Sequence, residues 1–224
     1  MKQIVDLTAS FGPGKVSLVP GHPPVEYQMI HTHEKNHRTN AWISFSIHVG
    51  THIDPPYHFK PTGKTIDELP LHFFIGKAHV AHLRGKLSPG EGIGIAQIEG
   101  CGITQQMLHD CFLIIDTGWC ERYGTDAYYE EGYHLDPAMC QWLVDAGLRG
   151  VVLDCPPDPS ATEDAFDGTE SPAHRTLLSN DVVIIENCEN FSSLTQDTVE
   201  LYAIPLKIHR GCGGPARVFA IQDV

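Results

Sequence analysis

The sequence has little positive charge and no long apolar run. Lys and Arg together number 15 against 28 Asp and Glu, which gives a formal net charge of -13. A chain this acidic is repelled by nucleic-acid backbones and by anionic membrane surfaces. No run approaches the ~18 apolar residues of a membrane span, and the opening MKQIVDLTAS lacks the apolar core of a signal peptide. We therefore expect no nucleic-acid partner, no membrane association and a cytoplasmic location.

A paired-cysteine motif is also missing. The chain has seven cysteines, an odd number, and none of them forms C-x-x-C. This pattern argues against a disulfide framework and against a thiolate zinc knuckle. Cys111 precedes the apolar run FLIID and Cys140 lies within AMCQWLV. We therefore expect most of the thiols to be small buried side chains in a reducing compartment.

The chain has enough apolar residues for one core. It is 224 residues long and 42% hydrophobic, which suits one domain over residues 1–224, or at most two small ones. The helix and strand signals that follow predict a mixed, strand-rich α/β domain. Asp136-Pro137 and Ser171-Pro172 are helix-start signals. Helices are expected at 136–150 and 171–180, with a short one at 104–110. Short apolar runs predict strands in a strand-rich fold, at residues 3–7, 41–49, 77–83, 111–117, 150–154, 181–186, 201–208 and 216–221.

Two histidine-rich patterns compete as a metal site among the fourteen histidines. The first is HEKNH at 33–37, a literal H-E-x-x-H, which binds zinc only when a helix places both histidines on one face. Its flanks MIHT and RTNAW carry no apolar stripe that could bury such a helix, so we interpret the segment as a solvated loop. The glycines of GEGIGIAQ do not form G-x-G-x-x-G, so a nucleotide site is the weakest alternative.

The second pattern is HVGTHIDPPYHF at 48–59. It offers three imidazoles and one carboxylate, from His48, His52, Asp54 and His58, within eleven residues. Three protein ligands with one open position are what a catalytic metal needs to hold a water. Imidazole and carboxylate ligands without thiolate suit zinc or manganese, and iron is an alternative. A histidine-rich loop with purely structural hydrogen bonds would show the same letters.

This segment closely resembles the H-x-G-T-H-x-D-x-P-x-H-F signature of the metal-dependent cyclase family, which includes kynurenine formamidases and isatin hydrolases. Every fixed position of the signature is present: His48, Gly50, Thr51, His52, Asp54, Pro56, His58 and Phe59. The opening IVDLT, Pro20-Gly21 and the closing PLKI and PARVFAI also look like the family. The resemblance implies a swivelling β/β/α-type α/β domain that acts on a small molecule as a homodimer or homotetramer.

The resemblance extends to two residues further along the chain. Formamidase-type members carry a His twelve residues before a Glu, which matches His174 and Glu186. It implies that His48, His52 and Asp54 bind one metal, and that Asp54, His174 and Glu186 bind or bridge to a second. Some relatives with an amide at the Glu position look mononuclear, so one or two divalent ions per chain are expected. A surface carboxylate and an exposed helix histidine are the alternatives for Glu186 and His174.

The expected chemistry is hydrolysis of a small amide, lactam or lactone by a metal-bound hydroxide. His58 resembles the family's proton shuttle and would be the catalytic residue, although it could instead be another ligand. We expect Thr51 to support the loop and Trp119 to lie in the core. Asp154, at the end of VVLD, is a candidate for orienting a ligand histidine or for capping a loop.

The substrate is less constrained by the sequence. Kynurenine formamidases have a substrate-stacking Trp before the early Pro-Gly, where this chain has Val19. This departure disfavours N-formylkynurenine and leaves isatin-like lactams, other formamides and lactones open. A non-catalytic metal- or ligand-binding scaffold and a polyketide-type cyclase (a lyase) are the alternative functions.

Overall fold

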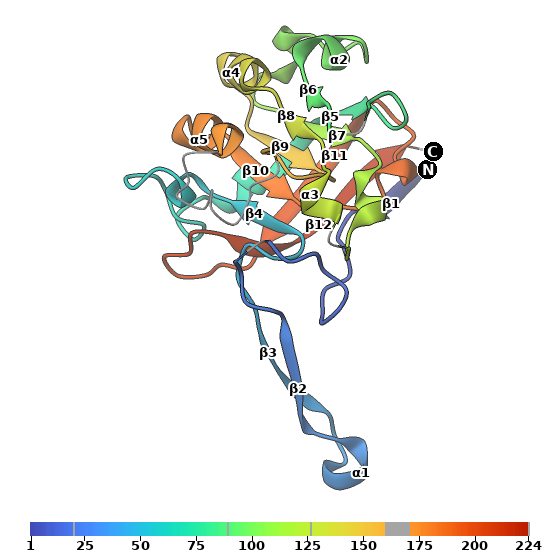
Figure 1. Cartoon of the computed structure of the whole chain (residues 1–224), viewed down its shortest axis with the longest axis vertical. Helices are drawn as coiled ribbons and strands as arrows, with labels where there is room; N and C mark the ends of the chain where they lie inside the picture. Colours follow the sequence, from blue (N-terminus) through green and yellow to red (C-terminus); the bar gives the residue numbers. More distant parts are fainter. Residues whose placement is uncertain (20, 89, 126, 160–170, 224) are drawn as a thin grey trace.

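The centre of the molecule is one large sheet (Figure 1). The computed structural model describes residues 1–19, 21–88, 90–125, 127–159 and 171–223. Its 8-stranded sheet runs in the order β1-β12-β11-β5-β7-β9-β10-β4, and β4 also pairs with β12. This last pairing closes the sheet into a barrel, and β1 adds an outer strand. The strands are β1 (Lys2–Asp6), β4 (His52–Asp54), β5 (Ile75–His82), β7 (Phe112–Asp116), β9 (Gly150–Leu153), β10 (Val183–Glu186), β11 (Thr198–Pro205) and β12 (Gly214–Asp223).

The four neighbouring strands β5, β7, β9 and β10 are parallel, and β7, β9 and β10 are buried along their whole length. Their continuous apolar runs are typical of strands that are covered on both faces. Leu113 and Val151 pack in one core cluster with residues of the helices, whereas Phe112 and Val152 pack in a second cluster. The predicted strand-rich α/β domain is therefore correct.

Two helices cover one face of this sheet (Figure 1). They are α4 (Pro137–Asp145) and α5 (Pro172–Ser179), and each begins at the predicted proline. The short helix predicted at 104–110 is a 3₁₀ turn, η3 (Gln105–Leu108). The remaining short elements are α2 (Ile95–Glu99), α3 (Ala127–Glu130), β6 (Gly92–Ile93), β8 (His134–Leu135), η1 (Pro56–His58), η2 (Leu71–Phe74), η4 (Trp119–Arg122) and η6 (Phe191–Ser193). Within the part of the chain that the structure describes, no helix has the length and apolarity needed to cross a bilayer.

A two-stranded ribbon projects from the body of the molecule (Figure 1). It consists of β2 (Glu26–His31) and β3 (Asn40–Ser44), with the single helical turn α1 (His33–Asn36) at its tip. We call residues 26–44 the arm. The strand predicted at 41–49 ends early, at Ser44. The loop predicted for 33–37 was wrong, because a helical turn forms there and stops at His37, whose φ of 53° breaks the helix.

Candidate metal centre

Two neighbouring strands place the central side chains of the site. β4 and β10 are antiparallel, with Glu186 opposite His52 and Ile184 opposite Asp54. Because alternate residues of a strand face the same side, His52 and Asp54 lie on one face, whereas Ile53 packs into the core on the other. The pairing register therefore brings Glu186, from far along the chain, beside the first motif residues.

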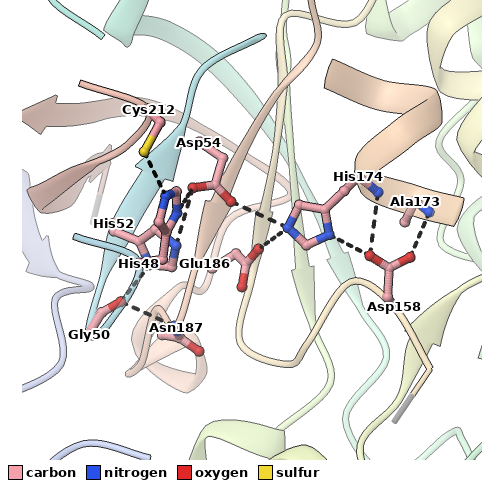
Figure 2. Close-up of polar contacts among 10 residues, drawn as sticks. All are labelled: His48, Gly50, His52, Asp54, Asp158, Ala173, His174, Glu186, Asn187 and Cys212. Atoms are coloured by element: carbon pink, nitrogen blue, oxygen red, sulfur yellow. Dashed lines mark hydrogen bonds and ion pairs between the residues drawn. The ribbon is translucent and has the colours of Figure 1, made fainter. Parts of the chain in front are cut away.

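Asp54 lies at the centre of the cluster (Figure 2). Its Oδ1 is 2.7 Å from Nδ1 of His48 and 3.3 Å from Nε2 of His52, and its Oδ2 is 3.4 Å from Nε2 of His174. The same His174 nitrogen is 3.0 Å from Oε1 of Glu186. All five residues predicted as ligands are thus brought together.

The other nitrogens of two of these histidines have hydrogen-bond partners. Nδ1 of His52 lies 2.8 Å from the carbonyl oxygen of Gly50, which also accepts a bond from the Asn187 side chain at 3.1 Å. Nδ1 of His174 contacts the carboxylate of Asp158, which also accepts the backbone N–H of Ala173 at 2.6 Å. Protons held at these nitrogens leave both Nε2 atoms free to face Asp54, as in histidines that ligate metals.

Burial and neighbouring charges set the protonation of the cluster. Burial lowers the pKa of His48, but the Asp54 carboxylate outweighs it and raises that pKa to about 10. For Asp54 the two effects have the opposite signs. Burial raises its pKa, but the charges of His52 and His48 outweigh burial and hold that pKa well below its usual value. The carboxylate is therefore ionised and the ring of His48 is protonated, and a bound cation would displace that proton.

The residues fit a divalent metal ion. Ligand atoms of His48, His52 and Asp54 lie within 4.8 Å of one another, as do those of Asp54, His58 and His174. Asp54 Oδ2 and Glu186 Oε1 are buried and have no partner in hydrogen-bond geometry among the described residues. Buried carboxylate oxygens are costly unless a hydrogen bond or a cation satisfies them. Imidazole and carboxylate together form a donor set that divalent metals accept.

His58 lies beside this cluster in η1. Its ring stacks on that of His48, with centroids 4.0 Å apart and an interplanar angle of 22°. Burial lowers the pKa of His58 to about 4, and the charges of His48 and His174 also lower it, against the effect of Asp54. The ring is therefore neutral near pH 7 and has a lone pair that can accept a proton.

Two further residues singled out in the sequence, Asp154 and Trp119, do not belong to the histidine cluster. Of the two alternatives for Asp154, the structure supports the loop cap: Asp154 is fully buried and accepts bonds from Thr117 and the backbone N–H of Gly118, and among the described residues no histidine bonds to its carboxylate. It fastens the loop after β7, as in the alternative reading of a loop cap. The prediction that Trp119 lies in the core is confirmed, because it is 7% exposed.

The loop residues next to the site also have defined places. Thr51 donates to the carbonyl of Asn187 and accepts the backbone N–H of Ala9, so it supports the loop as expected. Val19 is half-buried, whereas Pro20 lies outside the described residues. Burial lowers the pKa of His22, and the charges of His48 and His52 lower it further. His22, three residues after Val19, is therefore close enough to the cluster for the charges of its histidines to act on it.

The H-E-x-x-H pattern contributes no ligand to this centre. His33 and His37 are exposed at the tip of the arm, and neither belongs to the candidate metal groups among the described residues. The interpretation of this pattern as solvated is confirmed.

Two residues at the site were missed from the sequence. Asp158 has the role predicted for Asp154, because its carboxylate orients His174. Cys212 places its Sγ 3.4 Å from Nε2 of His48. Asp158 lies well before α5 in the sequence, 15 and 16 positions from Ala173 and His174, so no local spacing links it to His174, and nothing near Cys212 in the sequence points to His48.

A buried cluster of histidines and carboxylates that fits a divalent cation is the kind of site that metal-dependent enzymes use. The family model described as "Putative cyclase" matches residues 5–157, and the chain belongs to this cyclase family. Kynurenine formamidase of Geobacillus thermodenitrificans (strain NG80-2) is 30% identical over 203 residues, which cover 88% of each chain. The protein is a metal-dependent hydrolase of this family.

Solved structures agree with this fold. An isatin hydrolase bound to the product analogue thioisatinate superposes with a TM-score of 0.86 at 21% identity, over 100% of this chain and 93% of that one. A predicted metal-dependent hydrolase from Bacillus stearothermophilus superposes with a TM-score of 0.75 at 25% identity, over 100% of both chains. The expected cyclase-type fold is confirmed.

Proposed function

We propose that the protein hydrolyses the C–N bond of a small amide or lactam, or the C–O bond of a lactone, with one or two zinc or manganese ions per chain. The observation that carries this proposal is the geometry of the buried Asp54 carboxylate, which lies between His48, His52 and His174. The kynurenine formamidase and isatin hydrolase relatives support amide and lactam substrates.

The ligands have separate roles in this proposal. His48, His52 and Asp54 hold one cation, and Asp54, His174 and Glu186 hold a second. When bound, a divalent cation supplies Lewis acidity, which lowers the pKa of a coordinated water and polarises a carbonyl oxygen. The protein residues fix where that chemistry takes place, since each of the three histidines is buried or nearly so.

His58 moves the proton in this reaction. Its neutral ring accepts a proton from the attacking water and returns it to the leaving nitrogen or oxygen. The new bond joins the water oxygen to the carbonyl carbon, and the bond that breaks joins this carbon to the leaving atom. The His58 ring stacks on that of His48 and lies close to Asp54 and His174, so His58 lies beside the residues that would hold the cations.

The substrate test compares three chemical classes. Protein reconstituted with zinc or with manganese is incubated with N-formylkynurenine, with isatin and with simple lactones. The masses of the products are then measured by mass spectrometry. We expect products that have gained one water, and weaker turnover of N-formylkynurenine, because Val19 lacks the flat face of an aromatic ring. Protein stripped with a chelator is the control and should be inactive.

The same assay separates the alternative functions. A polyketide-type cyclase would yield a product that has lost one water, and a non-catalytic scaffold would bind metal without turnover. His58→Gln should keep the metal and lose most of the turnover, typically about 10²–10⁴-fold for a general acid–base group. Equal turnover by this variant would refute the role of His58.

We also propose that the chain acts as a homodimer or homotetramer in the cytoplasm. The arm supports assembly, because an isolated two-stranded ribbon is marginally stable alone and exposes large apolar side chains. Trp42 is 46% exposed and Ile30 is 54% exposed. The seven free thiols suit a reducing compartment.

Light scattering tests the assembly. We expect wild-type protein at twice or four times the chain mass, and dissociation when Trp42→Ser is introduced. The matched control is Leu71→Ser, which removes an apolar side chain that is 64% exposed on the body in η2. A monomeric wild type, or equal effects of the two changes, would contradict the proposal.

A further inference from the structure

The imidazole of His48 faces a different partner at each ring nitrogen (Figure 2). Nδ1 lies 2.7 Å from Oδ1 of Asp54, on the side of the candidate cation position. Nε2 lies 3.4 Å from Sγ of Cys212, on the opposite side. Cys212 is 164 positions away in the sequence and half-buried.

The chain around Cys212 also confines the ring of His48. A Cβ atom added to Gly213 would lie 2.7 Å from Cε1 of His48, which is closer than real Cβ contacts allow. The backbone of this segment therefore packs directly against the imidazole. β12 begins at the next residue, and its Pro215 pairs with His52. The strand register thus fixes the segment relative to β4.

The tautomer of His48 decides which nitrogen can bind a cation. A neutral imidazole carries one N–H and one lone pair, and only the nitrogen with the lone pair can ligate. Nδ1 is the nitrogen that faces Asp54, on the side of the candidate cation position. A cation there takes the lone pair of Nδ1 and leaves the proton at Nε2, where the sulfur of Cys212 is a weak acceptor. The lone pair of Nδ1 is then directed toward Asp54 and His52.

We propose that Cys212 is a positioning residue that accepts the Nε2–H of His48 and thereby makes Nδ1 the metal ligand. This inference rests on the metal-dependent function proposed above. It completes a pattern, because His52 has the carbonyl of Gly50 at its other nitrogen and His174 has the carboxylate of Asp158. Such partners fix the orientation of ligand histidines, and their loss typically lowers metal affinity by about 10–100-fold.

A competing role for the thiol is direct ligation. Ligand atoms of His48, His58 and Cys212 also lie within 4.8 Å of one another. Direct ligation would place a cation on the Nε2 side of His48, away from His52. The two roles differ in whether sulfur bonds to the metal, and that difference is visible in a spectrum.

The experiment compares Cys212→Ala, Cys212→Ser and the control Cys101→Ser. Cys101 is also half-buried, and its thiol contacts the carbonyl of His82 at 3.7 Å. Zinc and manganese dissociation constants are measured by chelator competition, and each protein is loaded with Co²⁺ for an absorption spectrum. Circular dichroism confirms that each variant is folded.

We expect the alanine variant to bind about 10–100-fold more weakly, whereas the serine variant, whose hydroxyl still accepts a hydrogen bond, keeps most of the affinity. The control should match wild type, and cobalt-loaded wild type should show no sulfur-to-metal charge-transfer band. Unchanged affinity in the alanine variant, or a charge-transfer band that the serine variant loses, would overturn the proposal. A wild type that binds no metal would refute the proposed function itself, which separates the two failures.

Discussion

The carboxylate of Asp158 contacts both His174 and the backbone at the start of α5. A substitution at Asp158 can show whether its main effect is on metal binding through His174 or on the stability of α5. Asp158→Asn keeps the shape of the side chain and one oxygen that can accept the Ala173 N–H, now bonded at 2.6 Å. Its amide would instead present an N–H to Nδ1 of His174. That exchange favours the proton at Nε2, the nitrogen that faces Asp54 and Glu186, and so removes the lone pair needed by a cation.

The magnitudes of the two effects differ. Loss of the orienting carboxylate should weaken metal binding by about 10–100-fold, which corresponds to about 1.4–2.7 kcal/mol. Loss of the negative charge near the start of α5 should cost the metal-free protein only about 0.3–1 kcal/mol of unfolding free energy. The substitution should therefore weaken the free energy of metal binding by more than it lowers the unfolding free energy of the metal-free protein.

Isothermal titration with zinc and urea unfolding of the metal-free protein measure these two quantities. The matched control is Asp181→Asn, which breaks an exposed pair with Lys60 at 3.0 Å, just after the other end of α5. Such a surface pair contributes about 0.2–1 kcal/mol, and its loss should leave metal binding unchanged. The reasoning fails if Asp158→Asn binds zinc as wild type does, or if both variants lose equal affinity.

Two further changes test other parts of the site. Glu186→Gln removes the carboxylate charge beside His174 and should reduce the bound metal by one ion per chain in mass spectrometry of the native protein; an unchanged count would contradict the second position. Asp154→Asn tests the buried loop carboxylate, since burial raises the pKa of Asp154 to about 6. The folded state then holds this proton more tightly than the unfolded chain does, so stability falls as pH rises through the window from the unfolded pKa to about 6. Wild type should gain up to about 3 kcal/mol over the variant between pH 7 and pH 4 in urea unfolding, and a difference independent of pH would refute this protonation.

The motif residues were predictable because they are local. His48, His52, Asp54 and His58 lie within eleven residues, and short-range backbone geometry brings them together. His174 and Glu186 came from the family resemblance, and the strand register of β4 and β10 explains why they meet the motif. The central strands were also predictable, because their apolar runs are continuous.

The remaining features depend on contacts between distant segments. Asp154 and Asp158 both follow the same strand, and only the packing of α5 decides which carboxylate meets His174. Cys212 reaches His48 through the pairing of β12 with β4, which no local pattern encodes. The helical turn at His33–Asn36 forms at the tip of the arm without any buried residue, so an apolar stripe could not have revealed it.

Metal content per chain in wild type, His52→Ala and His33→Ala tests the central claim most directly. The three proteins are purified without a histidine tag or a chelator, and zinc and manganese are measured by elemental analysis. We predict one or two equivalents in wild type, loss of tight binding and activity in His52→Ala, and little change in His33→Ala, whose histidine is exposed on the arm. Metal retained in His52→Ala, or lost in His33→Ala, would contradict the assignment of the metal centre to β4 and its neighbours.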